Sequence, residues 1–178
     1  MVGSNKKKIG LFGGSFDPPH QGHLKISKIA INKLALNKLY WCVTKQSPFK
    51  RKTFFSLSNR IRKSELLTVK EKKIKVEYFE SKTKSKNTID LVKYLNKKNK
   101  KNDFFLIIGS DNLINFHKWK SWKQLVKLIK IVVFSRKDYD IKAGKSDIIR
   151  KVKKIIFIKN KPINISSTQI RKKFIKLK

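Results

Sequence analysis

The chain has 178 residues and a formal net charge of +35, because 46 Lys and Arg outnumber 11 Asp and Glu. Its single cysteine, Cys42, excludes an internal disulfide framework and fits a reducing compartment. Apolar runs such as Phe104–Ile108 are far shorter than the ~18–20 residues that a membrane helix needs, and Gly13 ends the N-terminal apolar patch too early for a signal peptide. We therefore expect one cytoplasmic domain over residues 1–178, with no membrane partner.

The positive charge favours polyanionic partners: nucleic acid, anionic membranes or phosphorylated small molecules. The excess is mostly lysine and is spread along the sequence, whereas proteins that read bases usually do so with arginine. We favour a solvated, lysine-coated surface over a dedicated nucleic-acid face. A basic nucleic-acid-binding protein is kept as the alternative from another functional class.

Short apolar strands alternate with helical patterns along the chain. Strands are predicted at Ile9–Phe12, Leu39–Val43, Ile74–Tyr78, Phe104–Ile108, Ile131–Phe134 and Ile155–Ile158. Helices are predicted at His23–Leu36, Asn59–Val69 (with Asn59 as N-cap), Thr88–Leu95, Asn112–Phe116, Ser121–Ile129 and Ser167–Leu177, and loops at Thr44–Ser58 and Ser81–Lys86. This order predicts a Rossmann-like, doubly wound α/β fold: a mainly parallel sheet with helices on both faces. Ligands of such sheets bind at the carboxyl ends of the strands.

The segment after the first strand is the first of two that indicate chemistry. It reads Gly-Gly-Ser-Phe-Asp-Pro-Pro-His-Gln-Gly-His and runs from Gly13 to His23. The glycines allow close backbone approach to an anion, and His20 and His23 stand where the loop enters a helix whose dipole favours anions. Two other roles for these histidines are possible: capping of the helix and ligation of a metal. Metal ligation is the weaker of the two, because no Cys or Asp/Glu cluster at recognisable spacing completes a ligand set. Asp17 fits a turn cap and a catalytic role equally well.

The second segment is Ile-Ser-Ser-Thr-Gln-Ile-Arg, which ends at Arg171. Ser166 and Gln169 have capping-box spacing, and Ile170, Phe174 and Leu177 predict the buried stripe of the last helix. The helix start offers N–H groups, hydroxyls and a guanidinium, which together suit a polyphosphate. Alone, the segment would be an ordinary capped helix; beside two histidines we expect a phosphate cradle.

Together the two motifs resemble the nucleotidylyltransferase superfamily with the His-x-Gly-His signature. Within it, the chain resembles the nicotinate-nucleotide adenylyltransferase family from about Lys8 to Phe174, through Asn87-Thr88-Ile89-Asp90, Gly109-Ser110-Asp111-Asn112 with Phe116-His117-Lys118-Trp119, and Phe134-Ser135-Arg136. Ser47-Pro48-Phe49-Lys50 departs from the family's usual Pro-Pro-His-Lys, and Asn87 stands where many members carry Tyr. The pantetheine-phosphate adenylyltransferases share both terminal motifs and are the closest rival.

The resemblance implies adenylyl transfer from ATP to nicotinate mononucleotide, with Mg²⁺ bound through the ATP phosphates. It implies ATP contacts from Gly13, Gly14, Ser15, Phe16, His20, His23, Gly109, Asp111, Ser166, Ser167, Thr168 and Arg171. It places Lys50, Thr88, Trp119 and Arg136 toward the mononucleotide, with Trp119 stacked on the pyridine ring. His20, His23, Lys50 and Arg171 are the implied catalytic residues, and we expect a monomer or homodimer.

The chemistry explains why no general base is expected. A phosphate monoester has a second pKa of about 6 and is already a nucleophile at neutral pH. The enzyme must then position two anions and neutralise their charge, for which His20 and His23 are the predicted hydrogen-bond donors. Asp111 has helix capping as its alternative role. We expect core packing for Trp122, a surface position for His117 and an inert core thiol for Cys42.

Overall fold

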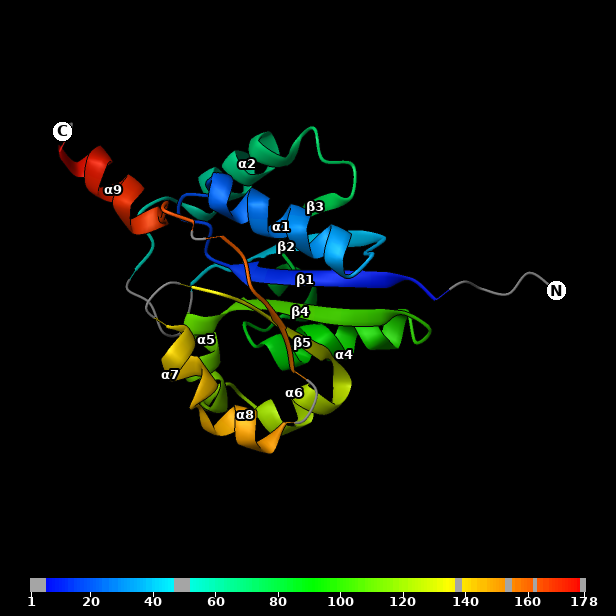
Figure 1. Ribbon diagram of the computed structural model, residues 1–178. Helices are drawn as coiled ribbons and strands as arrows, with labels where there is room; N and C mark the ends of the chain where they lie inside the picture. The colour runs from blue at the N-terminus through cyan, green and yellow to red at the C-terminus, as the bar shows by residue number, and fades with distance from the viewer. Residues whose placement is uncertain (1–5, 47–51, 137–138, 153–154, 162, 177–178) are drawn as a thin grey trace.

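The computed structural model describes residues 6–46, 52–136, 139–152, 155–161 and 163–176. In this part of the chain six strands form one parallel sheet in the order β3-β2-β1-β4-β5-β6 (Figure 1). They are β1 (Lys8–Gly14), β2 (Lys38–Val43), β3 (Ile74–Glu77), β4 (Asp103–Gly109), β5 (Lys130–Phe134) and β6 (Ile155–Ile158). All five strand pairs are parallel. The strand order runs outward in opposite directions from β1 and β4, so the chain switches direction across the sheet between these two strands.

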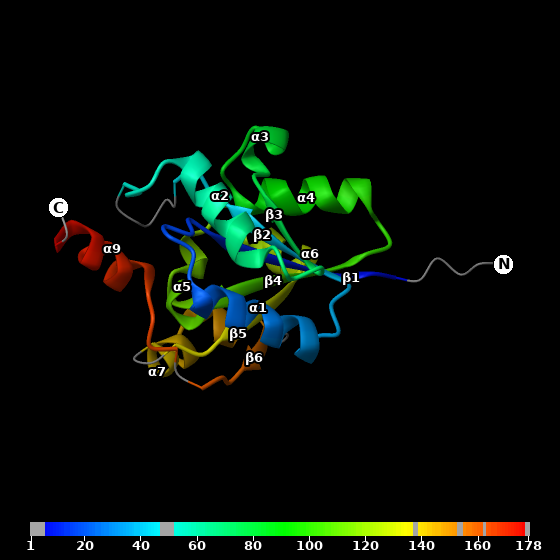
Figure 2. The ribbon, with the colours of Figure 1, turned by 90° about the horizontal axis from the view of Figure 1, so that it is seen from above.

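Helices cover both faces of the sheet, which confirms the predicted doubly wound fold (Figures 1 and 2). One apolar cluster joins the sheet to α1 (Gln21–Lys33) and α2 (Leu57–Thr68). The other joins it to α4 (Thr88–Lys98), α5 (Ser110–Ile114), α6 (Trp122–Leu128), α7 (Asp140–Gly144) and α8 (Asp147–Lys151). Side chains of a strand alternate between the faces, so Leu11 packs in one cluster and Phe12 in the other.

The short helices differ most from the prediction. The segment predicted as a loop from Ser81 contains α3 (Glu80–Thr83), and α7 and α8 were not predicted. A 3₁₀ turn, η1 (Phe116–Lys118), follows α5. Helix α2 begins earlier than predicted because Ser56, not Asn59, is its N-cap: the Ser56 hydroxyl accepts from the Asn59 N–H at 3.3 Å.

The last helix, α9 (Ser167–Lys176), projects beyond the end of the sheet (Figure 1). The buried stripe predicted for it is wrong in its second half, since Phe174 is 43% exposed. The Phe174 ring makes a T-shaped contact with the Phe55 ring, with the ring centroids 5.6 Å apart. Leu177 lies outside the described residues. Packing on the sheet therefore does not hold the distal turns of α9.

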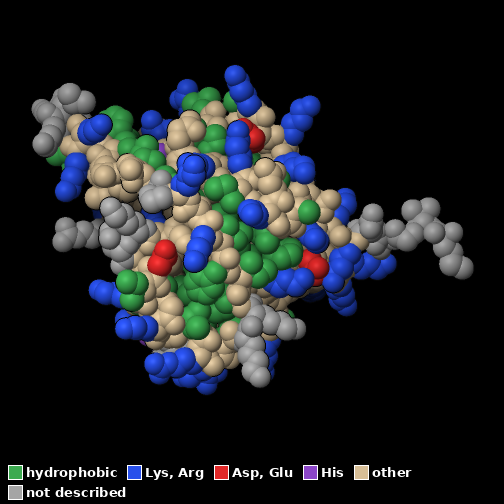
Figure 3. Space-filling model, viewed as in Figure 1, with side chains coloured by type: hydrophobic (Ala, Val, Ile, Leu, Met, Phe, Trp, Pro, Cys, Tyr) green, Lys and Arg blue, Asp and Glu red, His purple; other side chains and the backbone are tan. Residues whose placement is uncertain are grey.

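Lysine and arginine side chains are spread over the visible surface, with few carboxylates among them (Figure 3). This agrees with the predicted lysine-coated surface. Within the described ranges, no helix has the length and apolar character needed to cross a membrane.

Candidate functional site

The loop after β1 and the tip of α9 meet, although up to 154 residues separate the contacting pairs. The Ser167 hydroxyl donates to the Pro18 carbonyl at 2.9 Å. Arg171 donates from Nη1 to the Asp17 carbonyl, and the same nitrogen lies 3.6 Å from Asp17 Oδ2. The two motifs therefore form one surface at the carboxyl end of β1.

The tip of α9 is ordered by the predicted capping box. The Gln169 N–H donates to the Ser166 hydroxyl at 3.2 Å, and Gln169 Oε1 accepts from the Ser166 N–H at 2.9 Å. Thr168 accepts a hydrogen bond from Arg171 Nη2 at 3.0 Å. Ser167 and Arg171 thus hold the tip of α9 against the loop after β1.

His20 and His23 cap the N-terminus of α1 reciprocally. His20 Nδ1 accepts from the Gly22 N–H at 3.1 Å, and His23 Nδ1 accepts from the His20 N–H at 3.2 Å. A neutral imidazole that accepts at Nδ1 carries its proton on Nε2. Helix capping, the alternative role given by the sequence, is therefore confirmed. It also holds both rings in the Nε2–H tautomer, which can donate a hydrogen bond to an anion.

His20 is neutral over the physiological range. Burial, together with the nearby Arg136 guanidinium, lowers the pKa of His20 from 6.5 to about 4. Its ring centroid is 3.8 Å from that of His23. Two imidazoles in contact are more easily accommodated when one of them is uncharged.

Gly22 makes this close packing possible. A Cβ at Gly22 would lie 2.8 Å from Ile163 Cγ2 and 2.9 Å from the His20 ring. Ile163 belongs to the segment that leads into α9, so the glycine between the histidines lets the C-terminal segment lie directly on the α1 N-terminus. The spacing His-x-Gly-His therefore has a steric reason.

Asp17 is a structural anchor. It is buried, and its two carboxylate oxygens accept the N–H groups of Phe54 and Phe55 at 2.8 and 2.9 Å. With Arg171 also beside it, its oxygens are occupied by the protein itself. Phe16 is likewise structural in its side chain: the ring is 2% exposed and stacks on Trp41 at 4.7 Å. The Phe16 side chain therefore belongs to the core.

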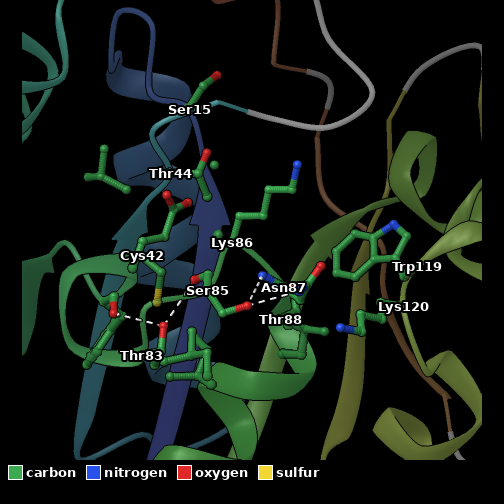
Figure 4. Close-up of a pocket in the computed structure, with 18 of the residues that line it drawn as sticks. Ser15, Cys42, Thr44, Thr83, Ser85, Lys86, Asn87, Thr88, Trp119 and Lys120 are labelled. Carbon is green, nitrogen blue, oxygen red and sulfur yellow. Dashed lines mark hydrogen bonds between the residues drawn. The ribbon is translucent and has the colours of Figure 1, made fainter.

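A cavity of about 410 Å³ opens beside these elements, at the carboxyl ends of β1, β2 and β4 (Figure 4). Its wall contains three of the predicted ATP residues, Gly13, Gly14 and Ser15, and two of the predicted mononucleotide residues, Thr88 and Trp119. The cavity thus holds part of each predicted set, at the crevice expected for a parallel sheet. His20, His23 and the tip of α9 lie outside its lining.

Trp119 forms an aromatic wall of the cavity. Its ring stacks on Phe116 with centroids 4.9 Å apart, and its buried Nε1 has no hydrogen-bond partner in the described structure. Thr44 Oγ1, at the end of β2, is also buried without a partner there. The sequence reasoning missed Thr44, although its place directly after a strand was a usable signal.

The rim of the cavity is polar and basic. Lys86, Lys118 and Lys120 line it, none of them predicted, together with Asn87. The Asn87 side chain donates to Asp90 Oδ2 at 3.2 Å instead of capping α4. Lysine is so frequent in this chain that no motif could have singled these three out.

Gly109, Asp111 and Arg136 form a separate cluster. Asp111 pairs with Arg136 at 2.7 Å, and Gly109, not Asp111, is the N-cap residue of α5. A Cβ at Gly109 would collide with the Asp111 carboxylate. Arg136 does not line the cavity in the described structure, and its charge acts on His20. It therefore lies nearer the predicted ATP residues than the mononucleotide side for which it was predicted.

Of the remaining predicted residues, one lies outside the described structure and three have the surroundings that were predicted for them. Lys50, with its neighbours 47–51, lies outside the described residues. Cys42 is buried, and burial raises the pKa of its thiol far above its usual value, as expected of an inert core thiol. Trp122 packs against the core and His117 is exposed, as predicted.

Comparison with known proteins agrees with this geometry. Residues 11–173 match the model of the cytidylyltransferase-like family. A protein of Pelagibacter ubique (strain HTCC1062), described as a probable nicotinate-nucleotide adenylyltransferase, is 46% identical over 173 residues, 96% of each chain. A protein of Rhizobium leguminosarum bv. trifolii (strain WSM2304) with the same description is 39% identical over 129 residues, 72% of this chain and 67% of its own.

Solved structures show the same fold. Plasmodium falciparum nicotinic acid mononucleotide adenylyltransferase complexed with NaAD has a TM-score of 0.76 and 24% identity, over 93% of this chain and 83% of that one. The same enzyme complexed with APC has a TM-score of 0.77 and 22% identity, at the same coverage. From the family match and the extent of the sequence identity, the chain belongs to the cytidylyltransferase-like family, in the group of the nicotinate-nucleotide adenylyltransferases.

Proposed function

We propose that the protein transfers the adenylyl group of ATP to nicotinate mononucleotide, releasing pyrophosphate and forming nicotinate adenine dinucleotide. The observation that carries the proposal is the contact between the His20–His23 loop and the tip of α9, beside a cavity with an aromatic wall. The function of the curated relatives supports the same reaction.

In this reaction a phosphate oxygen of the mononucleotide attacks the α-phosphorus of ATP. The bond from that phosphorus to the oxygen bridging the α- and β-phosphates breaks, and pyrophosphate leaves with the electron pair. No proton has to be removed from the nucleophile, because the phosphate is already ionised. The Nε2–H groups of His20 and His23 donate to the phosphate oxygens as charge moves to the leaving group.

Helix geometry adds to this stabilisation. Helix α1 directs the positive end of its dipole toward the loop that holds the histidines, and the capped start of α9 faces the same region. Arg171 adds a guanidinium whose Nη1 is held on the Asp17 carbonyl. These groups are fixed before the substrate binds, so they lose little freedom during the reaction.

Mg²⁺ belongs to the nucleotide in this proposal. Among the described residues no group of three or more His, Cys, Asp or Glu is arranged to hold a metal ion, and Asp17 and Asp111 are already occupied by protein donors. The donor set therefore fits a cation held mainly by ATP phosphates, which neutralises part of their charge.

The test is an acceptor panel. Purified protein receives ATP and Mg²⁺ with nicotinate mononucleotide, its amide analogue or 4′-phosphopantetheine, and pyrophosphate release and the dinucleotide product are both measured. We expect turnover with the pyridine nucleotides, and the flat wall of Trp119 favours them over a pantetheine chain. The proposal is wrong if phosphopantetheine is the only acceptor that supports turnover, or if turnover occurs without any acceptor.

A further inference from the structure

Arg60, on the first turn of α2, is the only arginine among the largest fully buried side chains of the described structure. It is 1% exposed and surrounded by backbone carbonyls. Its Nη1 donates to the carbonyls of Ser15 at 2.6 Å and Thr44 at 2.7 Å. Its Nε donates to Phe55 at 3.1 Å and its Nη2 to Lys45 at 2.9 Å. One guanidinium thus binds four carbonyls.

The four carbonyls belong to two connections, the one after β1 and the one between β2 and α2. Ser15 follows β1, Thr44 and Lys45 follow β2, and Phe55 precedes α2. Ser15 and Thr44 both line the cavity. The Thr44 N–H also donates to the Gly14 carbonyl at 3.0 Å, as a continuation of the β1–β2 pairing. Arg60 Nη1 extends this connection by one residue, to Ser15, in the loop proposed to bind ATP.

Two carboxylates hold the same loops by their N–H groups. Asp17 accepts from the Phe55 N–H at 2.9 Å, and Glu80 accepts from the Lys45 N–H at 3.2 Å. Phe55 and Lys45 are therefore each held at both their N–H and their carbonyl. Within the described ranges no carboxylate oxygen lies within 4.0 Å of the Arg60 guanidinium.

Burial lowers the pKa of Arg60 and outweighs the charges of Asp17 and Glu80, which favour the cation. An apolar side chain would fill the same space without this desolvation cost. What a guanidinium offers here is a planar set of donors that reaches several carbonyls at once. Alignment of two substrates is the property most sensitive to such a fixed distance, since a shift of about 1 Å can reduce the rate by about 10²-fold.

We propose that Arg60 is a positioning residue that sets the spacing between the loop after β1 and the end of β2, and so aligns ATP with its acceptor. The identity of the two substrates rests on the proposed function, whereas the structural role of Arg60 does not depend on it. It predicts an effect on kcat that exceeds the effect on either KM, because each substrate keeps its own contacts.

The test compares Arg60→Lys with Thr68→Val. An ammonium is compact and cannot reach four carbonyls. Thr68 is a matched control: it is buried on the same helix, and its hydroxyl donates only to carbonyls of that helix, Ser64 at 2.9 Å and Glu65 at 3.3 Å. We expect Arg60→Lys to lose on the order of 10²-fold in kcat with less than about threefold change in either KM. Thr68→Val should keep wild-type kcat even if its Tm falls as far as that of Arg60→Lys.

Two further measurements keep the proposal falsifiable. Low, non-denaturing concentrations of guanidinium should restore part of the kcat of Arg60→Ala, whereas equal ammonium should not. Amide hydrogen exchange at residues 13–16 and 44–46 should be faster in Arg60→Lys than in Thr68→Val. If the lysine variant cannot be purified, Arg60→Gln replaces it, with an expected loss in kcat of about 10²-fold or more, since its amide has only two N–H donors.

The outcomes separate the two proposals. A wild-type protein that makes no dinucleotide refutes the proposed function, while the exchange data still decide whether Arg60 holds the loops. Equal kcat in the Arg60 and Thr68 variants at equal Tm, or unchanged exchange at both loops, overturns the positioning role.

Discussion

The two roles of His20, helix cap and hydrogen-bond donor, can be separated by substitution. Asn is a good N-cap residue and can replace Nδ1 as the acceptor for the Gly22 N–H, but it lacks a donor at the position of Nε2. Ala lacks both. We therefore expect His20→Asn and His20→Ala to lose the same activity and different amounts of stability.

The magnitudes follow from the geometry. Loss of the cap costs about 1 kcal/mol, and truncation of the buried ring adds about 1 kcal/mol in His20→Ala. His20→Asn should lose less than about 1 kcal/mol. For a chain of this length each kcal/mol lowers Tm by about 2–4 °C. Loss of one preorganised donor should reduce kcat by about 10²–10³-fold in both variants.

Thermal unfolding and steady-state kinetics with ATP and nicotinate mononucleotide measure the two effects on the same preparations. Ser27→Ala, in the same helix, is a control for general destabilisation. Its hydroxyl donates to the His23 carbonyl at 2.9 Å and accepts from the buried Trp41 Nε1 at 2.7 Å, so its loss leaves the Trp41 N–H without this partner. If His20→Asn retains near wild-type kcat, His20 acts only as a cap and the donor role is wrong.

Four other outcomes are expected. Because the folded pKa of His20 is about 4, below 6.5, its contribution to stability is present above pH 6.5 and is lost as pH falls toward 4; urea unfolding should show up to about 3 kcal/mol of pH dependence that His20→Asn lacks. Gly22→Ala should lose about 1–3 kcal/mol of unfolding free energy and most activity, because its Cβ meets Ile163 and the His20 ring; wild-type Tm would contradict this. Trp119→Ala should raise the acceptor KM on the order of tenfold and leave the ATP KM unchanged, with Trp119→Phe in between; equal changes in both KM values would refute the stacking role. Cys42 lines the cavity but is 5% exposed, and burial raises the pKa of its thiol, so a thiol reagent should label it far more slowly than an exposed thiol; fast labelling of native protein would contradict this.

The sheet could be read from the sequence because its signals are local. Five predicted strands are short, mainly apolar runs, and the sixth, Ile74–Tyr78, alternates apolar and charged residues; all six were found. The short helices α3, α7 and α8 escaped because four or five residues carry no helical period. The N-cap of α2 was misplaced because Ser56 and Asn59 are both good caps and only the folded backbone selects between them.

The site could be read only as far as its motifs extend. The contact of Ser167 with Pro18 follows from the joint presence of two motifs, not from either one alone. Arg60 gave no signal, because a lone arginine on a helix looks like a surface residue until the carbonyls around it are known. The core packing of Phe16 gave no signal either, because a residue inside a binding motif can also serve the core.

The attachment of α9 has a consequence for local unfolding. All six strands precede residue 159, whereas Ser167 and Arg171 join α9 to the rest of the protein by polar contacts to the loop after β1. A helix held by few apolar contacts opens at a lower free energy than a buried sheet. Amide exchange in α9 should therefore be faster than in β1 and β4 while the sheet stays folded.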